Sequence, residues 1–299
     1  MRVPVSFIVP TRNEERNVGD AIRSVIDWAA EVFILDSYSE DATVEIAQAM
    51  GAQVARRRFD NFSAQKNWAL DNLQLRSEWV FFLDADERLT AALRREIAEL
   101  LQSCSGCDGF YVARKNHFMG QWIRHAGMFP DWQLRLFKRG LGRYEDRVVH
   151  EHVLLKGRAG YLRNPLEHHD TKGLTRWFER HNVYTSMEAQ EIIKLGPSDQ
   201  RIRLRPRLLV RGPERTRLIK EIAYRYLPCR SPLVFLWMYL IRGGFLDGRI
   251  GFRYCVLKAF VDYQTSLKVL ELKAAYQMSS NQEPSSSTAA PENVPEDLH

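Results

Sequence analysis

The sequence predicts an α/β fold with a doubly wound, mostly parallel sheet and a helical region at its carboxyl end. Strand-like and helix-like segments alternate from Val5 to Leu101, which is typical of a parallel sheet. The run Val80-Phe-Phe-Leu-Asp-Ala-Asp-Glu87 begins with the continuous apolar character of a strand buried on both faces. Beyond Gly173 the pattern is mainly helical, with interruptions at Gly196-Pro197 and Gly212-Pro213.

The predicted elements follow in order along the chain. Strands are expected at Val5 to Val9, Glu31 to Asp36, Gln53 to Ala55 and Trp79 to Asp84. Apolar residues at helical spacing predict helices at Val18 to Ile26, Ala42 to Met50, Ser63 to Leu70 and Leu89 to Leu101. Gly51 ends the second helix and Ser63 caps the third. After Gly109, short β-like pieces that extend the sheet are expected at Phe110 to Ala113, Gln133 to Lys138 and Arg147 to Leu155.

Composition fits a globular body followed by a disordered tail. The chain has 299 residues, of which 45% are hydrophobic and 27% are charged. Its last 21 residues, Ser279 to His299, are rich in Ser, Pro and Glu and contain no Lys or Arg. Without the four acids of this tail the formal charge rises from +6 to +10, which favours anionic partners. We therefore expect a catalytic domain over residues 1–170, a helical region over 171–278 and a disordered tail over 279–299.

The helical region has a basic part followed by an apolar part. Seven arginines and a lysine, against one acid, lie between Arg201 and Lys220, and the apolar run Leu233 to Ile241 follows. This pattern fits helices lying in an anionic membrane interface, or a helical subdomain packed on the sheet with a solvated basic face. The apolar run has nine residues, whereas a spanning helix needs about 20, so no crossing is expected. No nucleic-acid-reading motif is present, so nucleic acid is not an expected partner.

Targeting and redox features point to a cytoplasmic protein. Met1-Arg-Val-Pro leads directly into the first predicted strand, so no signal peptide is expected. Cys104 and Cys107 form a C-x-x-C without the second pair that a structural zinc site needs. We interpret them as reduced loop cysteines.

Two carboxylates, Asp84 and Asp86, follow the fourth predicted strand with one small residue, Ala85, between them. Ligands of open α/β sheets bind beyond the carboxyl ends of the strands. Close carboxylates repel each other unless a cation or a proton intervenes, and Mg²⁺ or Mn²⁺ is the natural partner of oxygen ligands. A glycosidase pair would need a separation of roughly 5 to 9.5 Å, which suits an i, i+2 pair poorly. The remaining alternative is that this D-x-D simply begins a turn.

Polar residues suited to a nucleotide follow the other predicted strands. Strand one gives Pro10-Thr-Arg-Asn-Glu14, strand two gives Asp36-Ser37-Tyr38-Ser39, and the third helix carries Gln65-Lys66-Asn67. Carboxylates and amides can bind ribose or a base edge, and a lysine can meet a diphosphate. Neither a G-x-G-x-x-G after a strand nor a P-loop is present, so a metal ion must carry much of the phosphate binding.

These segments together resemble family 2 glycosyltransferases with the GT-A fold. The resemblance rests on Val5-Ser-Phe-Ile-Val-Pro-Thr-Arg-Asn-Glu14, on Ile34-Leu-Asp-Ser-Tyr-Ser-Glu-Asp-Ala-Thr43 and on the D-x-D in Phe82-Leu-Asp-Ala-Asp-Glu87. Phe59-x-x-Phe-Ser-Ala-Gln-Lys-Asn67 and Val148-Val-His-Glu151 are similar to the branch of lipopolysaccharide core β-glucosyltransferases.

The resemblance implies an inverting enzyme that moves a sugar, glucose in that branch, from a UDP-sugar to a lipid-linked saccharide. It implies Mg²⁺ or Mn²⁺ on Asp86 with Asp84 assisting, Lys66 near the diphosphate, and Asp36 and Glu14 at the uridine. The other expected donor contacts are Pro10, Thr11, Asn13, Ser37, Asn67 and Ala85.

By its position relative to the acidic residue that this family carries after the acceptor region, Glu151 is the expected general base, with Asp131 and Asp146 as alternatives. His168 and His169 are adjacent on a strand, so at most one faces the cleft, and His169 is considered as a further metal ligand. A lipid-linked acceptor would suit a peripheral location at the cytoplasmic face of the plasma membrane.

Two other functions are considered. A nucleotidyltransferase also places metal-binding aspartates on an α/β sheet, but it would normally have a glycine-rich loop after strand one, and Thr11-Arg-Asn-Glu-Glu15 has no glycine. A non-catalytic nucleotide-sugar or lipid-binding protein is the third function, and the presence of Asp84, Asp86 and Glu151 argues against it.

Overall fold

The parallel half of the sheet is built as the sequence predicts. The computed structural model describes residues 2–103, 106–146, 152–169, 171–194 and 230–280. Strand β1 (Val3–Thr11) pairs in parallel with β2 (Ala29–Asp36) and β4 (Trp79–Phe82), and β3 (Gln53–Arg56) flanks β2. Strand β4 ends at Phe82, two residues before the predicted end, so Asp84 lies in the turn beyond the strand.

The other half of the sheet is mixed. The ten-stranded sheet has its main path in the order β3-β2-β1-β4-β8-β6-β12-β5. Strand β8 (Asp131–Lys138) runs antiparallel to both β4 and β6 (Gly109–Phe118), and β12 (Leu166–His169) runs parallel to β6. The short strands are β5 (Glu87–Arg88), β7 (Gln121–Trp122) and β11 (Ala159–Tyr161), and β9 (Gly142–Tyr144) and β10 (Val153–Leu155) form a separate hairpin. Of the strand predicted at Arg147 to Leu155, residues 147–151 lie outside the described residues.

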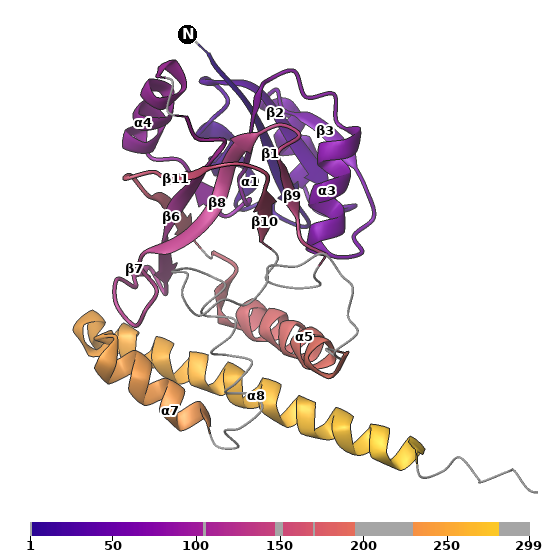
Figure 1. The fold of residues 1–299 in the computed structure, drawn as a ribbon, viewed down its shortest axis with the longest axis vertical. Coiled ribbons are helices and arrows are strands. Elements are labelled where there is room, and N and C mark those ends of the chain that lie inside the picture. The colour runs from indigo at the N-terminus through magenta and orange to yellow at the C-terminus, as the bar shows by residue number, and fades with distance from the viewer. Residues whose placement is uncertain (1, 104–105, 147–151, 170, 195–229, 281–299) are drawn as a thin grey trace, which may run out of the picture.

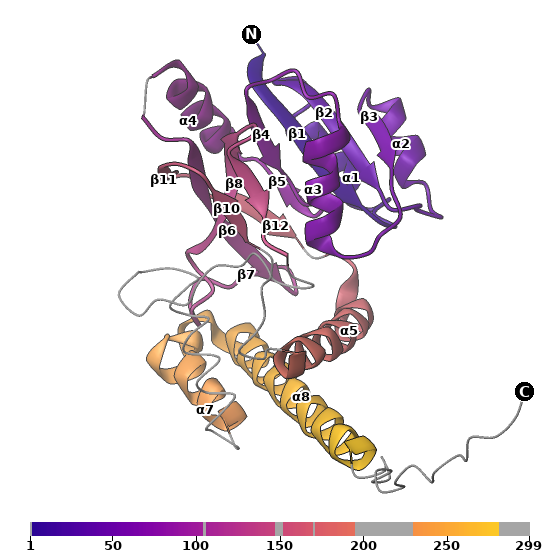
Figure 2. The ribbon, with the colours of Figure 1, turned by 45° about the vertical axis from the view of Figure 1, so that its right-hand side comes forward.

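Both faces of the central strands are buried, which explains their continuous apolar runs. Phe7 stacks on Phe81 on one face, with ring centroids 5.0 Å apart, whereas Ile8 and Phe82 join the core on the opposite face. The helices that accompany the sheet are α1 (Val18–Arg23), α2 (Thr43–Ala49), α3 (Phe62–Asn72) and α4 (Ala91–Gln102), as Figure 2 shows. The cap of α3 is Asn61, which accepts a hydrogen bond from Ala64 N at 2.7 Å, so the prediction that Ser63 caps this helix was wrong.

A helical region lies beside the sheet, as predicted (Figure 1). It comprises α5 (Gly173–Lys194), α7 (Arg230–Leu236), η1 (Trp237–Ile241), η2 (Gly244–Asp247) and α8 (Gly248–Ser280). A third core joins it to the β6–β7 end of the sheet, where Phe118 contacts Trp177 and Tyr254. Asp247 also accepts hydrogen bonds from the backbone N and Nδ1 of His125, both at 2.8 Å.

Parts of the expected domain organisation remain predictions. The boundary residue 170, the basic segment 201–220 and almost all of the tail lie outside the described residues. Among the residues that the structure describes, no helix combines the length and the apolar character that crossing a bilayer would require. Cys107 and Cys255 are in no disulfide with a described residue, and Cys104 lies outside that set.

Candidate active site

The loops after β1 and β2 are fixed to each other by short hydrogen bonds. Asp36 is fully buried at the end of β2 and accepts hydrogen bonds from Thr11 Oγ1 at 3.0 Å and from Ser39 N at 2.9 Å. The side chain of Asn13 accepts from Glu40 N at 2.9 Å. Asp36 and Asn13, both predicted to contact the donor, therefore also hold these two loops in shape.

A second group of contacts extends this wall to α3. Ser37 is buried, and its hydroxyl accepts a hydrogen bond from Nε2 of Gln65 at 2.6 Å. The next residue, Tyr38, is 54% exposed and has a φ of 56°, a conformation that a bulky side chain rarely adopts. Such a residue costs of order 1–3 kcal/mol and persists only where its surroundings fix it. Tyr38 belongs to the segment Asp36-Ser37-Tyr38-Ser39 that is predicted to follow strand two, but no individual role is predicted for it from the sequence.

Glu14 lies between the β1 loop and the segment after β12. Its carboxylate accepts from Asn17 Nδ2 at 2.9 Å and pairs with the ammonium of Lys172. Burial raises the pKa of Glu14 above its ordinary value, and the negative charge of Asp86 acts in the same direction. The negative charge of Asp86 thus acts on Glu14, and a cation bound at Asp86 would weaken that repulsion.

The turn that carries the D-x-D begins where β4 ends. Leu83 still donates its N–H to Ile8 O at 3.0 Å, and Glu87 N donates to Asp84 O at 2.9 Å. Ala85 is buried, so the two aspartates flank a residue that points into the core. Asp84 is 31% exposed and Asp86 is 18% exposed.

Asp84 is held by two cations. Oδ2 of Asp84 lies 2.5 Å from Nη2 of Arg135, and Oδ1 lies 4.0 Å from Nζ of Lys66. Burial alone would raise the pKa of Asp84, but Arg135 and Lys66 hold it well below its usual range. Asp84 is therefore a carboxylate across the ordinary pH range.

A buried ion network continues from Arg135. Nη2 of Arg135 also lies 2.5 Å from Oε1 of Glu87, which is fully buried, and that same oxygen lies 3.5 Å from Nη1 of Arg114. Arg114 in turn pairs with Asp131 at 2.8 Å. No role is predicted from the sequence for Arg114, Arg135 or Glu87. The available signal was the isolated charge in the apolar strand segment Leu134-Arg-Leu-Phe137.

Asp86 pairs with a histidine from β12. Nε2 of His168 lies 3.2 Å from Oδ2 of Asp86. Burial disfavours the ionised carboxylate, but His168 outweighs that effect and lowers the pKa of Asp86 to about 2. The other ring nitrogen of His168, Nδ1, is buried and has no hydrogen-bond partner among the described residues.

His169 has a different environment from His168. Its backbone N donates to Asp86 O at 2.9 Å, while its imidazole stacks on that of His117 with ring centroids 4.3 Å apart. The pairing of β6 with β12 explains the difference, since neighbours in register share a face and successive residues alternate. At most one histidine faces the D-x-D, as predicted. The structure thus places the imidazole of His168, and not that of His169, beside the carboxylate of Asp86.

Comparison with known proteins identifies the family. The sequence profile described as glycosyl transferase family 2 matches residues 6–169. The chain belongs to this family.

Relatives and solved structures agree with that assignment. The lipopolysaccharide core biosynthesis glycosyltransferase LpsC of Rhizobium meliloti (strain 1021) is 29% identical over 277 residues, which cover 88% of this chain and 93% of that protein. An uncharacterized glycosyltransferase of Rickettsia typhi is 24% identical and covers 90% of this chain and 87% of its own length. The mannosyltransferase PcManGT of Pyrobaculum calidifontis, solved with GDP-Man and Mn²⁺, has a TM-score of 0.50 at 16% identity over 90% of this chain and 88% of its own. The protein is thus a glycosyltransferase with the predicted GT-A fold.

The side chains at the D-x-D of this family 2 glycosyltransferase offer ligand atoms that fit a divalent cation. Asp86 and His168 present an oxygen and a nitrogen 3.2 Å apart, and both side chains are partly accessible. Asp84 has each of its oxygens near a cationic side chain, so Asp86 is the less engaged carboxylate. Oxygen ligands with one imidazole suit Mn²⁺ better than Mg²⁺, which rarely takes nitrogen.

The structure also bears on the three predicted bases of the glycosyltransferase. Asp131 accepts hydrogen bonds from Arg114 at 2.9 Å and from Asn116 at 3.2 Å. Burial would raise the pKa of Asp131, but Arg114 and these hydrogen bonds keep it below the ordinary value, which makes Asp131 a weak base. Asp146 is exposed at the end of the described part of the β9 side of the hairpin. Glu151 lies outside the described residues.

The ends of the segment that contains Glu151 are fixed near the D-x-D. Glu145 N donates to His152 O at 2.9 Å, and His152 N donates to the buried carboxylate of Glu145 at 3.0 Å. One residue earlier, the ring of Tyr144 lies 4.9 Å from Nζ of Lys66, and Tyr144 N donates to Asn67 Oδ1 at 2.9 Å. Lys66 and Asn67 therefore link this hairpin to Asp84.

Proposed function

We propose that the protein is an inverting, metal-dependent glycosyltransferase that moves a sugar from a UDP-sugar to a lipid-linked saccharide of the lipopolysaccharide inner core. The observation that carries this proposal is the pairing of Asp86 with His168 beside an Asp84 that Arg135 and Lys66 keep ionised. The name of the relative LpsC supports the acceptor class. Resemblance to the β-glucosyltransferase branch makes glucose the first sugar to test.

The donor would bind across the loops after β1, β2 and β4. A divalent ion held by Asp86 and His168 would neutralise the charge that grows on the leaving diphosphate. Lys66, on α3, has its ammonium 4.0 Å from Oδ1 of Asp84, and an ammonium is suited to a phosphate oxygen. Asp36 and Glu14 remain the proposed uridine contacts, with Thr11, Asn13 and Ser37 holding the loops that carry them.

Glu151 remains the first candidate for the general base. The base must accept the proton of the acceptor hydroxyl on the face of the sugar opposite the diphosphate. Arg114 keeps Asp131 ionised and engaged, which favours a residue of the segment between Glu145 and His152. Asp146 is the second candidate in that segment.

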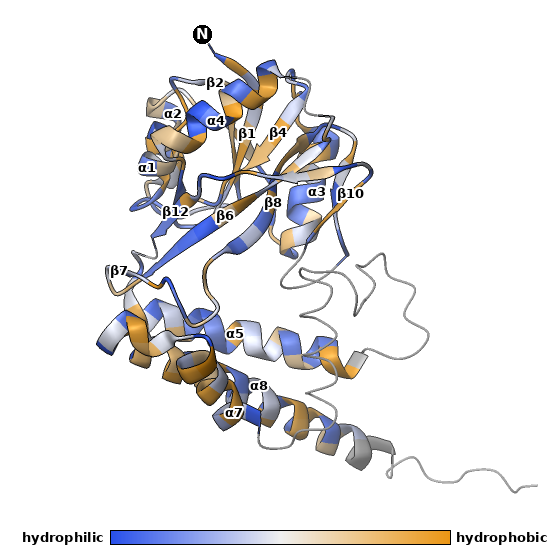
Figure 3. Cartoon of the chain, turned by 60° about the vertical axis from the view of Figure 1, so that its left-hand side comes forward, coloured by the Kyte–Doolittle hydropathy of each residue, from blue (hydrophilic) through white to orange (hydrophobic). Residues whose placement is uncertain are grey.

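We further propose that the helical region docks on an anionic membrane surface at the cytoplasmic face of the plasma membrane. Along α8 the side chains at helical spacing from Phe252 to Leu270 are exposed and apolar: Phe252, Val256, Phe260, Tyr263, Leu267 and Leu270. The neighbouring α7 and η1 expose Leu233, Leu236, Trp237, Leu240 and Ile241. Figure 3 shows the apolar colouring of both helices. Exposed apolar stripes of this kind mark interaction sites.

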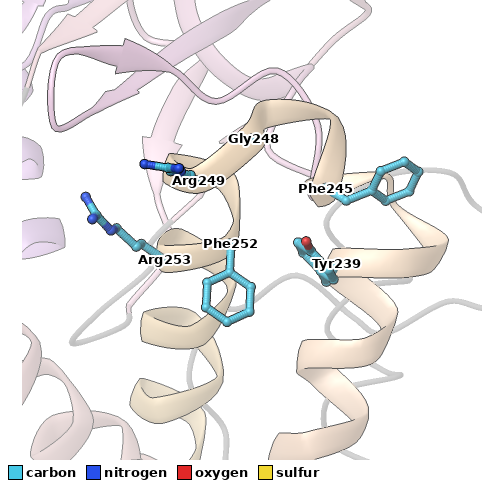
Figure 4. Close-up of a pocket in the computed structure, with 6 residues that line it drawn as sticks. All are labelled: Tyr239, Phe245, Gly248, Arg249, Phe252 and Arg253. Carbon is cyan, nitrogen blue, oxygen red and sulfur yellow. The ribbon is translucent and has the colours of Figure 1, made fainter.

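Basic residues accompany this apolar surface. Arg249 and Arg253, one turn apart on α8, project beside a pocket whose aromatic lining is Tyr239, Phe245 and Phe252 (Figure 4). Arginines next to exposed aromatic and aliphatic side chains suit the headgroup level of a bilayer with acidic lipids. A lipid-linked acceptor would be presented at the same surface.

Turnover with a panel of donors tests the reaction. The purified protein is incubated with UDP-glucose, other UDP-sugars and GDP-mannose, with Mn²⁺ or with EDTA, and with lipopolysaccharide core extracts as acceptor. We expect UDP release and labelled lipid only with Mn²⁺, and loss of both in Asp86→Ala. Release from GDP-mannose alone would refute the UDP assignment, and turnover that is insensitive to EDTA would refute the metal dependence.

A further inference from the structure

A second group of side chains of the kinds that bind metal ions lies on the face of the sheet opposite to the D-x-D. In the parallel pairing of β6 with β12, His117 is in register with His169, and Lys115 with Glu167. Residues in register share a face, so these four side chains project to one side. The alternate pair, Asn116 and His168, projects to the side of Asp131 and Asp86.

Three of these side chains converge. Nε2 of His117 lies 3.6 Å from Oε2 of Glu167, and the two imidazoles stack at an interplanar angle of 13°. One ligand atom from each of His117, Glu167 and His169 can be chosen so that all three lie within 4.8 Å of one another. Each side chain is half-buried, so the group is accessible to an ion while its backbone is fixed by the sheet.

The hydrogen bonds around His117 leave a nitrogen available to a cation. Nδ1 of His117 faces the carbonyl oxygen of His168 at 3.3 Å, which favours the tautomer with the proton on Nδ1. A backbone carbonyl in this position is the usual orienting partner of a metal-binding histidine. The lone pair of Nε2 then points toward Glu167.

We infer that His117, Glu167 and His169 form a second cation site, which takes Zn²⁺ or a similar borderline transition metal. Two imidazoles and one carboxylate, with a fourth position left to water, are a donor set that zinc accepts. Mn²⁺, the ion proposed at the D-x-D, favours sites rich in oxygen ligands, whereas two imidazoles favour zinc and related transition metals, so the two sites select different ions.

Lys115 limits the affinity of this site. Its ammonium lies 2.9 Å from Oε1 of Glu167 and repels a dication, although it leaves Oε2 directed toward His117. We therefore expect replacement of Lys115 by Met to tighten zinc binding, because the competing positive charge is removed while the chain length is kept.

The test measures zinc binding by titration calorimetry, with the full chain freed of any affinity tag. All proteins carry Asp86→Ala, so that the added zinc is not bound through Asp86 of the D-x-D. We expect about one Zn²⁺ per chain, with at least tenfold weaker binding after His117→Ala or Glu167→Gln and tighter binding after Lys115→Met. His181→Ala, which removes a histidine that stacks on Trp177 in α5, is the matched control and should bind zinc like its parent.

Visible absorption spectroscopy and circular dichroism separate the outcomes. Co²⁺ bound in place of zinc should give visible absorption bands that His169→Ala removes, and circular dichroism should report a folded chain for each variant. Absence of zinc binding in the Asp86→Ala parent would overturn the inference, as would binding that survives both His117→Ala and Glu167→Gln. Because the readout is zinc binding in a variant without the proposed donor site, failure here is independent of the proposed transferase function.

Discussion

Nη2 of Arg135 lies 2.5 Å from Oδ2 of Asp84, so a strand residue from the antiparallel half of the sheet fixes the first aspartate of the D-x-D. The same nitrogen is equally close to Oε1 of the fully buried Glu87. Two carboxylates thus share one guanidinium, and the turn between β4 and β5 depends on a cation that the sequence motif does not include.

Replacement of Arg135 by Met should strongly destabilise the fold. It leaves the buried carboxylate of Glu87 without its closest cation, and removing one partner of a buried pair costs about 3–5 kcal/mol. Urea unfolding monitored by circular dichroism measures this cost. Arg143→Met is the matched control, because Arg143 pairs with Asp71 at 2.9 Å on the exposed surface, where a pair contributes less than about 1 kcal/mol. Equal losses of unfolding free energy in both variants would contradict a stabilising role of Arg135 in the buried ion network.

Manganese binding should weaken as pH falls through the pKa of His168. Burial disfavours the imidazolium, but the ion pair with Asp86 outweighs it and raises this pKa above 6.5. Below the raised pKa a metal ion must displace the His168 proton, so affinity should fall by up to about tenfold per pH unit, and above it affinity should level off. Mn²⁺ titrations followed by electron paramagnetic resonance between pH 6 and pH 9 measure this dependence.

The ion pair between His168 and Asp86 should give the stability of the fold the opposite dependence on pH from that of metal binding. Because the folded pKa of His168 is raised, its contribution to stability is complete below pH 6.5 and is lost as pH rises through the folded value. In His168→Gln both dependences on pH should disappear over this window. A metal affinity that still falls toward low pH in that variant would assign the effect to another group.

Substitutions of Glu151 and Asp131 should distinguish a general base from a carboxylate that stabilises the fold. Glu151→Gln is expected to lower kcat for transfer by roughly 10²–10⁴-fold without weakening UDP binding, because it removes only proton transfer. Asp131→Asn should instead lower the stability of the fold, since it removes the charge that Arg114 faces. Steady-state kinetics and UDP titrations on both variants test this. Loss of turnover confined to Asp131→Asn would move the base to β8.

Charge reversal on α8 should release the protein from acidic membranes. Arg249→Glu combined with Arg253→Glu is expected to weaken binding to vesicles of acidic phospholipid by at least about tenfold, since each basic residue near the surface contributes of order 1 kcal/mol. Arg56→Glu with Arg58→Glu, two exposed arginines of the catalytic part, is the matched control. Co-sedimentation at low and high salt measures the partition. Equal binding by all proteins, or no binding of the wild-type protein to the acidic vesicles, would refute the docking surface.

The sequence predicted the parallel half of the fold well because that half is local. Each of β1, β2 and β4 is a short apolar run that ends in polar residues, and the pattern of Val5 to Val9 alone identifies a strand with two buried faces. The helix boundaries were less certain, since Asn61 and Ser63 are both good caps and only the geometry selects Asn61.

The part of the site that could not be predicted from the sequence consists of contacts between residues far apart in the chain. Arg135 is 51 residues from Asp84, and Glu14 is 158 residues from Lys172. A lone arginine in β8 has no local pattern that predicts its partner, because its position depends on the antiparallel insertion of β8 beside β4. The choice between His168 and His169 likewise depends on the register of β12 with β6, which the alternation rule alone leaves open.

In the proposed reaction Asp86 binds the metal ion that holds the nucleotide. The most direct measurement is UDP binding by titration calorimetry to the wild-type protein with Mn²⁺, to the same protein with EDTA, and to Asp86→Asn with Mn²⁺. We expect clear binding in the first case and binding at least about tenfold weaker in the other two. UDP that binds equally well in EDTA, or that binds Asp86→Asn as tightly as the wild type, would contradict it.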